Sequence, residues 1–476
     1  MESIWSQTCE LARRDPLPGD MKTEIAVIGA GMAGILIASA LQEAGHRVVV
    51  LESRRIGSGQ TRNTTAKITS QHGALYRKLT EDLDENRARL YGSAQEEAIR
   101  TYRDLIEKRG IDCELETCDA YVYGASAERL RREADTARRL GLPASFVSEV
   151  PLPVSAAGAV RFANQAQFHP LKFLSAMATD LTVYEETPVK TVEGGVIRTD
   201  RGTVRAEKIV FATHYPFINF PGLYFARMHQ ERSYVLALEN APRIDGMWVG
   251  PKLDGYSFRR YGDLLLLGGG GHRTGENREG GRYEDLRQKA RTWFPGCHEV
   301  AHWSAQDCMT PDNVPYIGRY AASRPNWYVA TGFHKWGMTS SMVSALLLRD
   351  LIDGKDNPYA VLFDPGRFSG SVLPGLCKEG RHAVKGLTKR IFLVPSKEVS
   401  DLPPGHGGVV TRNGDKVGVY KDLDGAVYAV DIRCRHLGCQ LEWNPDEKSW
   451  DCPCHGSRYD CRGQLISGPA QEDLTD

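Results

Sequence analysis

Hydrophobic and polar positions near the start of the chain follow a strand–turn–helix–strand pattern. Residues 24–28 form a short apolar run, and residues 35–44 form a helical stretch behind a glycine-rich turn. A second apolar run, 47–51, ends at Glu52. A strand that leads into a helix and then into another strand is typical of a parallel α/β unit. The pattern therefore predicts an α/β domain at this end of the chain.

Further along, charged helical segments alternate with apolar strands. Helical periodicity predicts helices at 83–110 and 127–140. Strands are predicted at 232–239, 255–260 and 264–267. These segments predict a second, mixed layer of strands and helices in the middle of the chain.

The pattern changes again towards the C-terminus. Residues 356–390 break the periodicity but lack the Ser/Gly monotony of a flexible tether, so they are predicted to be an ordered linker. From residue 391 onward, short alternating strands are separated by Asn-Gly and Asp-Gly turns. The predicted strands are 408–411, 416–421 and 426–431. We predict a small all-β domain over residues 391–476.

Length and composition limit the possible classes of protein. A chain of 476 residues is too long for one compact core, so two or three domains are expected. Lys+Arg and Asp+Glu both number 60, and this balance gives no indication of a nucleic-acid partner. No apolar run is long enough for a membrane span, and the first residues lack the features of a signal peptide. A cytoplasmic protein is expected.

The glycine-rich turn carries the first candidate chemistry. Gly29, Gly31 and Gly34 form a GxGxxG motif between strand and helix, and Glu52 follows at the end of the second strand. The glycines allow the backbone to approach a pyrophosphate, which the helix N-terminus stabilises, and the acid can bind a ribose hydroxyl. This motif does not distinguish FAD from NAD. The second glycine run, 268–271, precedes no helix, so one dinucleotide site is expected, which argues against a pyridine-nucleotide-dependent reductase.

Five of the eleven cysteines lie between residues 434 and 461. Cys434, His436, Cys452 and His455 supply two thiols and two imidazoles at short spacing. This set suits an iron–sulfur centre in which two histidines bind one iron, and it also suits a tetrahedral zinc site. A zinc site needs no further thiol, so the additional cysteines favour the iron–sulfur centre. The other six cysteines are scattered, as expected of free thiols in a reducing compartment.

The same residues resemble the Rieske [2Fe–2S] family, whose pattern is C-x-H-x-G-C followed by C-x-C-H-G-S. The resemblance implies that Cys434 and Cys452 bind one iron and that His436 and His455 bind the other. It also implies a Cys439–Cys454 disulfide. Hydroxyls at the positions of Ser457 and Tyr459 donate to cluster sulfurs in this family. Such donors raise the reduction potential, so the upper part of the Rieske range is expected.

Residues 20–355 resemble the flavoprotein group of D-amino-acid oxidase, glycine oxidase and sarcosine oxidase. Beside the GxGxxG motif, the resemblance rests on residues 54–69, 182–189, 205–213 and 315–339. It implies FAD as the cofactor, a Rossmann-like, glycine oxidase-like FAD-binding domain and a mixed-sheet substrate domain. The implied FAD-binding positions are Gly29, Gly31, Gly34, Glu52, Ser53, Arg54, Thr64, Thr65, Ala66, Val189, Ala212, Thr213, Gly332, Gly337, Met338 and Thr339.

The resemblance also suggests how the domains divide the chain. Residues 20–95, 155–215 and 300–355 are assigned to the FAD-binding domain. Residues 96–154 and 216–299 are assigned to the substrate domain, before the 356–390 linker and the 391–476 Rieske domain.

One departure from the flavoprotein group bears on the substrate. Asp307 stands where glycine oxidase-like members have an arginine that binds the substrate carboxylate. A carboxylate there suits a cationic amine, although a structural salt bridge is an equal alternative.

Other residues are candidates for roles near the flavin. Lys335, in the loop expected beside the flavin, is a candidate for stabilising reduced flavin or activating oxygen. Tyr256 is a candidate pocket residue, together with Tyr234 and Phe258. Weaker candidates are His72, His334 and Trp336. Cys308 is offset from the position of a covalent flavin link, so non-covalent FAD is expected.

Together these features predict an FAD-dependent oxidoreductase that oxidises an amine or amino compound. Hydride transfer to flavin would be followed by single-electron transfer to the Rieske cluster and then to an external acceptor or redox protein. One alternative is an oxidase that uses O2 and keeps the cluster for structure or regulation. Another is an electron-transfer component that feeds a partner enzyme.

Overall fold

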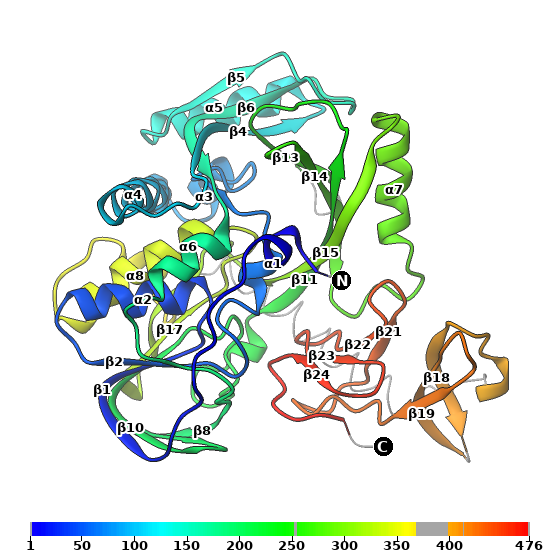
Figure 1. The fold of residues 1–476 in the computed structure, drawn as a ribbon. Helices are drawn as coiled ribbons and strands as arrows, with labels where there is room; N and C mark the ends of the chain where they lie inside the picture. The colour runs from blue at the N-terminus through cyan, green and yellow to red at the C-terminus, as the bar shows by residue number, and fades with distance from the viewer. Residues whose placement is uncertain (1, 252–254, 368–397, 413, 475–476) are drawn as a thin grey trace.

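The computed structural model describes residues 2–251, 255–367, 398–412 and 414–474. Two large sheets lie side by side, and the C-terminal strands form a separate pair of small sheets against one of them (Figure 1). No described helix is both long and apolar enough to cross a lipid bilayer.

The first sheet contains the predicted dinucleotide unit. Its strand order is β16-β17-β10-β1-β2-β7, with β8 and β9 joined to β10 as an antiparallel extension. The strands are β1 (Met21–Ile28), β2 (Val48–Leu51), β7 (Val183–Tyr184), β8 (Val189–Glu193), β9 (Val196–Thr199), β10 (Gly202–Phe211), β16 (Tyr316–Ala321) and β17 (Arg324–Thr331). β1 pairs in parallel with both β2 and β10, as a strand–helix–strand crossover requires.

Helices α2 (Met32–Glu43) and α8 (Gly337–Ile352) pack against each other beside this sheet (Figure 1). Both helices are apolar around most of their circumference, and their buried residues belong to the main core. Because α2 follows β1 directly, its N-terminus lies at the carboxyl end of the parallel strands, where α/β proteins bind nucleotides. The smaller helices are α1 (Ile4–Thr8), α6 (Pro170–Met177) and α9 (Ala360–Phe363), with η1 (Gln60–Asn63) and η2 (Tyr224–Ala226) as single 3-10 turns.

The second sheet has nine strands, with the main order β15-β11-β14-β13-β12-β4-β6-β3 and β5 beside β6. Its strands are β3 (Lys67–Ile68), β4 (Glu116–Gly124), β5 (Ala144–Val147), β6 (Gly158–Gln167), β11 (His229–Glu239), β12 (Met247–Val249), β13 (Ser257–Tyr261), β14 (Leu264–Arg273) and β15 (His298–Met309). Parallel and antiparallel pairs occur together, as a mixed sheet requires. Its helices are α3 (Tyr76–Asp82), α4 (Glu85–Arg109), α5 (Ala127–Arg139) and α7 (Arg282–Trp293).

Two local predictions can be compared with these elements. The helix predicted at 83–110 is α4, which begins after Asp84, whose carboxylate accepts a hydrogen bond from Arg87 N, and ends at Gly110 with φ of 60°. The strand predicted at 264–267 continues through the glycine run to Arg273. A Cβ on Gly269 would lie 3.0 Å from Tyr256 Cδ1, so close side-chain packing accounts for a glycine in the middle of this strand.

The C-terminal domain consists of two antiparallel sheets. The outer sheet has β18 (Gly407–Arg412), β19 (Asp415–Lys421) and β20 (Val427–Val430), and the inner sheet has β21 (Glu442–Asn444), β22 (Ser449–Asp451), β23 (Arg458–Asp460) and β24 (Leu465–Ser467). A 3-10 turn, η4 (Val399–Asp401), precedes them. The all-β prediction for this domain is confirmed. Most of the predicted linker and the first residues of the domain, 368–397, lie outside the described residues.

The division into FAD-binding and substrate domains stays a prediction. The limits at residues 95 and 300 fall inside α4 and β15. β6 and β15, whose residues were assigned mainly to the FAD-binding domain, pair with strands of the second sheet. Both strands belong to the second sheet along their length, so the chain passes between the two sheets outside them.

Candidate redox site

The two cluster loops meet at one edge of the inner C-terminal sheet. One loop precedes β21, and the other joins β22 to β23. The Nδ1 atoms of His436 and His455 lie 3.1 Å apart. One metal ion can bridge that separation at the usual histidine distance of about 2.0–2.1 Å. Cys434 and Cys452 are buried and not disulfide-bonded, so both thiols remain available. This donor set fits a [2Fe–2S] cluster with two histidines on one iron.

Other features of the loops agree with that donor set. Cys439 and Cys454 are disulfide-bonded, as the resemblance implied. The hydrogen bond between the two thiols lowers the pKa of Cys434 and raises that of Cys452, so it favours one thiolate in the pair. The Tyr459 hydroxyl lies 3.8 Å from Cys434 Sγ and accepts a hydrogen bond from Arg435 N, so its own proton can point to sulfur. Ser457 Oγ, also buried, accepts a hydrogen bond from Ala470 N at 3.0 Å.

The glycine turn before α2 fits a pyrophosphate cradle. A Cβ on Gly34 would lie 1.8 Å from the carbonyl oxygen of Gly29, and a Cβ on Gly29 would lie 2.6 Å from that of Ala212. Neither position admits a side chain, because both contacts are with backbone. Gly31, which N-caps α2, has more room, with a hypothetical Cβ 3.4 Å from Thr61 Oγ1. The turn therefore keeps its backbone amides close to the space in front of the helix.

Glu52 lies beside this turn with its carboxylate fixed by the backbone. Its Oε2 accepts a hydrogen bond from Ala30 N at 2.8 Å, and its Oε1 accepts bonds from Arg54 N at 2.9 Å and Ser53 Oγ at 3.1 Å. Ala212, at the end of β10, donates its N–H to Ile28 O at 2.9 Å. These contacts hold the predicted ribose-binding acid next to the glycine turn.

The loop 60–67 begins with the 3-10 turn η1 and ends at the first residue of β3, in the second sheet. Thr64 O accepts a hydrogen bond from Trp5 Nε1 at 2.7 Å, and Thr65 O accepts one from the buried Arg259. Ala66 has φ of 52° and donates its N–H to Thr64 Oγ1. The short helix α1, which carries Trp5, therefore fixes the conformation of a loop that is predicted to hold FAD.

The remaining predicted FAD positions lie at strand or helix ends. Gly332 follows β17 with φ of 72°, and a Cβ there would lie 2.4 Å from Thr310 Cγ2. Gly337, Met338 and Thr339 form the first turn of α8. Thr213 follows β10, and Val189 begins β8, where its carbonyl accepts a hydrogen bond from Gln471 Nε2 at 3.1 Å. Their roles in binding FAD stay predictions.

Three charged side chains gather between β11, β15 and the loop before α8. Glu231 and Asp307 are paired directly across the two strands, and Lys335 Nζ lies 3.8 Å from Glu231 Oε2. Desolvation raises the pKa of Asp307 to about 7. The predicted residues Asp307 and Lys335 are thus near one another, and Glu231 joins them. Glu231 was missed because its role depends on strand pairing.

Successive side chains of β11 and β15 point to opposite faces of the sheet, so the two faces contact different parts of the protein. Trp303 donates its indole N–H to Asn63 O in the loop 60–67, and Asp307 lies on that same face. Ser304 and Gln306 point the other way and contact the C-terminal domain. At β11 and β15, one sheet layer therefore lies between the cluster loops and the loop 60–67. Elsewhere a predicted FAD position reaches the C-terminal domain directly, because Arg54 donates a hydrogen bond to Leu465 O at 3.1 Å.

The contacts on the C-terminal side are buried and polar. Gln230 Nε2 donates to His455 O at 2.6 Å, and Gln306 Nε2 donates to Gly456 O at 2.8 Å and to Gln230 Oε1 at 2.6 Å. A Cβ on Gly456 would lie 2.8 Å from Gln230 Cβ, so only a glycine permits this approach. The loop that carries His455 is therefore fixed directly on the second sheet.

A buried ion network reinforces the interface. Glu447, between β21 and β22, contacts Arg232 at 2.9 Å and Arg458 at 3.1 Å. It also accepts hydrogen bonds at 2.8 Å from Ser304 Oγ and Tyr283 OH. In this way one carboxylate connects β11, β15, α7 and the C-terminal domain.

Other candidate residues lie elsewhere. Tyr256 packs against Trp293 of α7, and its hydroxyl lies 3.3 Å from Asp285 Oδ2. Tyr234 and Phe258 belong to the same hydrophobic cluster under α7. All three aromatic residues pack in the cluster that contains the buried residues of α7, and none has a contact with Asp307 among the described interactions. This placement supports the alternative interpretation that they are ordinary sheet-face aromatics.

The weaker candidates near the flavin loops form ring stacking and hydrogen bonds with other residues of the protein. His72 stacks on Trp336 and hydrogen-bonds Tyr91 OH at 2.6 Å, and desolvation lowers its pKa to about 3. Desolvation likewise lowers the pKa of His334 to about 4, and its Nε2 lies 2.7 Å from Thr310 Oγ1. Both imidazoles are therefore neutral near pH 7. Cys308 Sγ donates to His214 O.

Lys67 was not singled out by sequence reasoning. Its Nζ donates to Thr65 Oγ1 at 2.7 Å, and desolvation, helped by Arg259, lowers its pKa to about 7. Lys67 lies in β3, which is only two residues long. So short a strand gives no periodic pattern in the sequence, and the pattern could not reveal this lysine.

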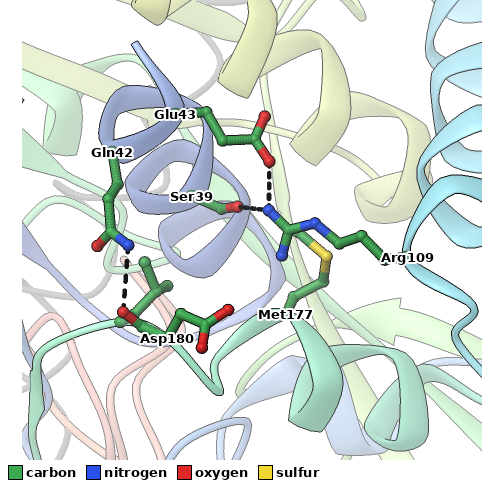
Figure 2. A pocket seen from close by; sticks show the side chains of 7 residues that line it. Ser39, Gln42, Glu43, Arg109, Met177 and Asp180 are labelled. Atoms are coloured by element: carbon green, nitrogen blue, oxygen red, sulfur yellow. Dashed lines mark hydrogen bonds and ion pairs between the residues drawn. The ribbon is translucent and has the colours of Figure 1, made fainter. Parts of the chain in front are cut away.

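Figure 2 shows a pocket lined by residues of α2, the last residue of α4 and residues 177–181. Its volume is about 280 Å³. Arg109 from α4 crosses the pocket to form an ion pair with Glu43 and a 3.0 Å hydrogen bond with Ser39 Oγ. Gln42 donates to Asp180 O at 3.1 Å. None of its lining residues is a predicted cofactor or cluster position, so we regard it as a gap in helix packing.

Comparisons with known proteins agree with this two-part arrangement. Residues 24–351 match the family "DAO: FAD dependent oxidoreductase", and residues 392–476 match the Rieske [2Fe-2S] domain. A Bacillus subtilis (strain 168) protein described as a Rieske 2Fe-2S iron-sulfur protein, YhfW, is 36% identical and aligns with 99% of this chain and 97% of its own length. The match to YhfW therefore includes both halves of the chain.

Solved structures match the first part. Glycine oxidase from Geobacillus kaustophilus has a TM-score of 0.62 at 22% identity, covering 73% of this chain and 100% of its own. L-proline dehydrogenase from P. horikoshii has a TM-score of 0.62 at 21% identity, covering 74% of this chain and 98% of its own. At these identities the likeness establishes the fold alone. The chain belongs to the DAO family of FAD-dependent oxidoreductases and carries a C-terminal Rieske [2Fe–2S] domain.

Proposed function

We propose that this protein is a dehydrogenase that oxidises an amine or amino compound and delivers the electrons through its Rieske centre to an external acceptor. The observation that carries the proposal is the position of β11 and β15 between the two redox halves. One face of these strands contacts the cluster loop, and the other faces the loops predicted to surround the flavin. Packed sheets are about 10 Å apart, so a single layer keeps the two halves close.

The cofactors supply complementary electron chemistry. Bound FAD supplies a two-electron acceptor for a C–H bond next to nitrogen, and a Rieske cluster supplies a one-electron carrier. The chain's own residues bind and orient the substrate and fix the two halves relative to each other.

Asp307 and Glu231 are the residues that favour a cationic nitrogen in the substrate. They form a carboxylate pair across β11 and β15, and Lys335 is the nearby cation that balances Glu231. A substrate ammonium group placed beside Asp307 would relieve the repulsion between the two acids. Glycine oxidase and L-proline dehydrogenase, which share the fold, are named for amino compounds, and this supports the same broad substrate class.

The position of His436 supports an external acceptor. This ligand is half-buried, and the Phe225 ring lies 6.5 Å from it. Three exposed apolar side chains adjoin the same segments, namely Phe220 at 70%, Leu223 at 45% and Leu437 at 38% exposure. Exposed apolar groups beside a redox centre suit contact with a protein partner. The acceptor and the expected cytoplasmic location stay predictions.

The function is tested by anaerobic mixing of the reconstituted protein with amines and amino acids. Flavin absorbance should bleach first, and the EPR signal of the reduced Rieske cluster should then appear without added reductant. Rapid hydrogen peroxide formation in air that does not depend on the cluster would instead identify an oxidase. Flavin that no substrate bleaches, together with a cluster that an external reductant reduces first, would identify an electron carrier.

Asp307 gives the substrate proposal a pH signature. Because its pKa is raised to about 7, Asp307 becomes ionised as the pH rises through that value. The KM for a cationic amine should therefore fall between about pH 6 and pH 8. Asp307→Asn should remove this dependence and raise KM by about 10-fold or more at pH 8, since hydrogen bonds to charged groups contribute about 1.5–3 kcal/mol.

The matched control is Asp285→Asn on α7, which also removes a carboxylate but lies beside Tyr256. Its KM and pH profile should equal those of the wild type. An Asp307→Asn variant that keeps the wild-type KM profile would rule out Asp307 as the group that binds the ammonium.

A further inference from the structure

A side chain from outside the Rieske domain contacts one of its histidine ligands. His436 Nε2 lies 2.7 Å from Asn219 Oδ1. Asn219 is 217 residues away in sequence and precedes β11, a strand of the second sheet. This contact has no part in the predicted ligand set, so the Rieske sequence pattern does not contain it.

The geometry assigns a role to each nitrogen of the His436 ring. Nδ1 faces Nδ1 of His455 at 3.1 Å, which leaves it for the metal. An amide oxygen accepts hydrogen bonds and cannot donate them, so Nε2 must carry the proton and donate it to Asn219. Asn219 thereby selects the tautomer in which Nδ1 has a free lone pair.

Neighbouring rings hold this arrangement in place. Phe225, six residues after Asn219 in the chain, lies edge-on to His436 at 6.5 Å and to His455 at 6.0 Å. The His436 ring therefore has an aromatic contact and a hydrogen bond from the same short segment, 219–225. The loop of the other histidine is fixed by Gln230 through the His455 carbonyl oxygen.

We propose that Asn219 is a positioning residue that sets the reduction potential of the Rieske cluster from the flavoprotein part of the chain. A hydrogen bond from the distal N–H of a metal-bound histidine to an acceptor fixes the ring and makes it a more basic ligand. A more basic ligand stabilises the more oxidised iron and lowers the potential. The hydrogen bond to Asn219 therefore lowers the reduction potential, whereas the hydroxyls of Ser457 and Tyr459 raise it. The potential then depends on docking of the two halves.

The test is the midpoint potential of the cluster in the full-length holoprotein, measured by dye-mediated titration with EPR detection and without substrate. Asn219→Ala removes the acceptor and should raise the potential. Asn219→Asp replaces it with a stronger, charged acceptor of the same size and should lower the potential. No substrate is required, so this result is independent of the proposed dehydrogenase function.

The control is Arg278→Ala, which breaks the 3.0 Å ion pair between Arg278 and Glu442 across the same interface and touches no ligand. Its potential should equal the wild-type value. Equal potentials in the two Asn219 variants and the wild type would overturn the proposal, as would shifts of both variants in the same direction. If Asn219→Ala does not retain iron, the isosteric Asn219→Asp decides alone, and a potential that is not lowered overturns the proposal.

Discussion

Replacement of Cys434 by serine is expected to abolish the Rieske EPR signal and to stop electron delivery to the external acceptor. Cys434 is a buried thiol without a disulfide partner and is a predicted ligand of the cluster iron. Loss of residues that only orient metal ligands already costs about 10- to 100-fold, so loss of a ligand should reduce the rate by at least about 100-fold. Reduction of a one-electron acceptor under anaerobic turnover measures this rate.

The same variant should still bind FAD and accept electrons from substrate. The glycine turn and Glu52 belong to the other half of the chain, so flavin bleaching by substrate should stay within about twofold of wild type. Cys297→Ser, which changes a half-buried cysteine outside the cluster, is the matched control and should keep both activities. If Cys434→Ser lost the cluster but kept the full rate of acceptor reduction, electrons would leave the flavin directly, and the proposed route through the cluster would be wrong.

Glu447→Ala is expected to cause the largest loss of stability at the interface. Arg232 and Arg458 have side chains only 2% and 8% exposed. Arg458 also pairs with the buried Asp451 at 3.0 Å, so removing Glu447 takes the ion-pair partner chiefly from Arg232. Removing one member of a buried ion pair leaves an uncompensated charge and costs about 3–5 kcal/mol. The free energy of unfolding in guanidinium chloride, followed through the cluster absorbance, should fall by this amount.

Acid should weaken the wild-type interface through the same group. Desolvation raises the pKa of Glu447, but the neighbouring Arg232 and Arg458 outweigh it and hold the pKa below the ordinary value. A carboxyl group whose folded pKa is lowered contributes its full stability above the unfolded pKa and loses it as the pH falls through the folded value. Stability should therefore decline below about pH 4 in the wild type and less steeply in Glu447→Ala.

Arg278→Ala is the control for this experiment too. The Arg278 side chain is 58% exposed, so solvent screens its pair with Glu442 and its loss should cost less than the loss of Glu447. A Glu447→Ala protein as stable as Arg278→Ala would mean that the buried network does not hold the domains together. Separate unfolding of the flavin and cluster signals would show in addition that the two halves had become uncoupled.

Several parts of the protein could be predicted because their signals are local. The GxGxxG turn, its flanking strand and helix, and Glu52 lie within about thirty residues, where backbone geometry dictates the residue types. The predicted cluster ligands follow fixed spacings on two short loops. Secondary structure was also predicted well where the periodic pattern extends over many residues, as in α4. The end of β14 was missed because a glycine run carries no hydrophobic period.

The candidate substrate site was only partly predictable. Asp307 and Lys335 were identified, but Glu231, which connects them, became apparent only when β11 paired with β15. Tyr256 was chosen from the strand predicted at 255–260, but β13 begins at Ser257, and the face on which neighbouring residues lie depends on the register of pairing. A shift of one residue would have placed it on the opposite face.

The sequence by itself indicated the fold classes, both cofactors and a predicted set of cluster ligands. Short-range spacing specified the glycine turn and the metal loops, and the resemblance over residues 20–355 selected FAD. The tertiary structure alone decided how the two redox halves meet. Asn219 reaches His436 across 217 residues, and Arg232 reaches Glu447 across 215. Such contacts depend on strand register and domain docking, which arise from the packing of the whole chain and leave no periodic pattern along it.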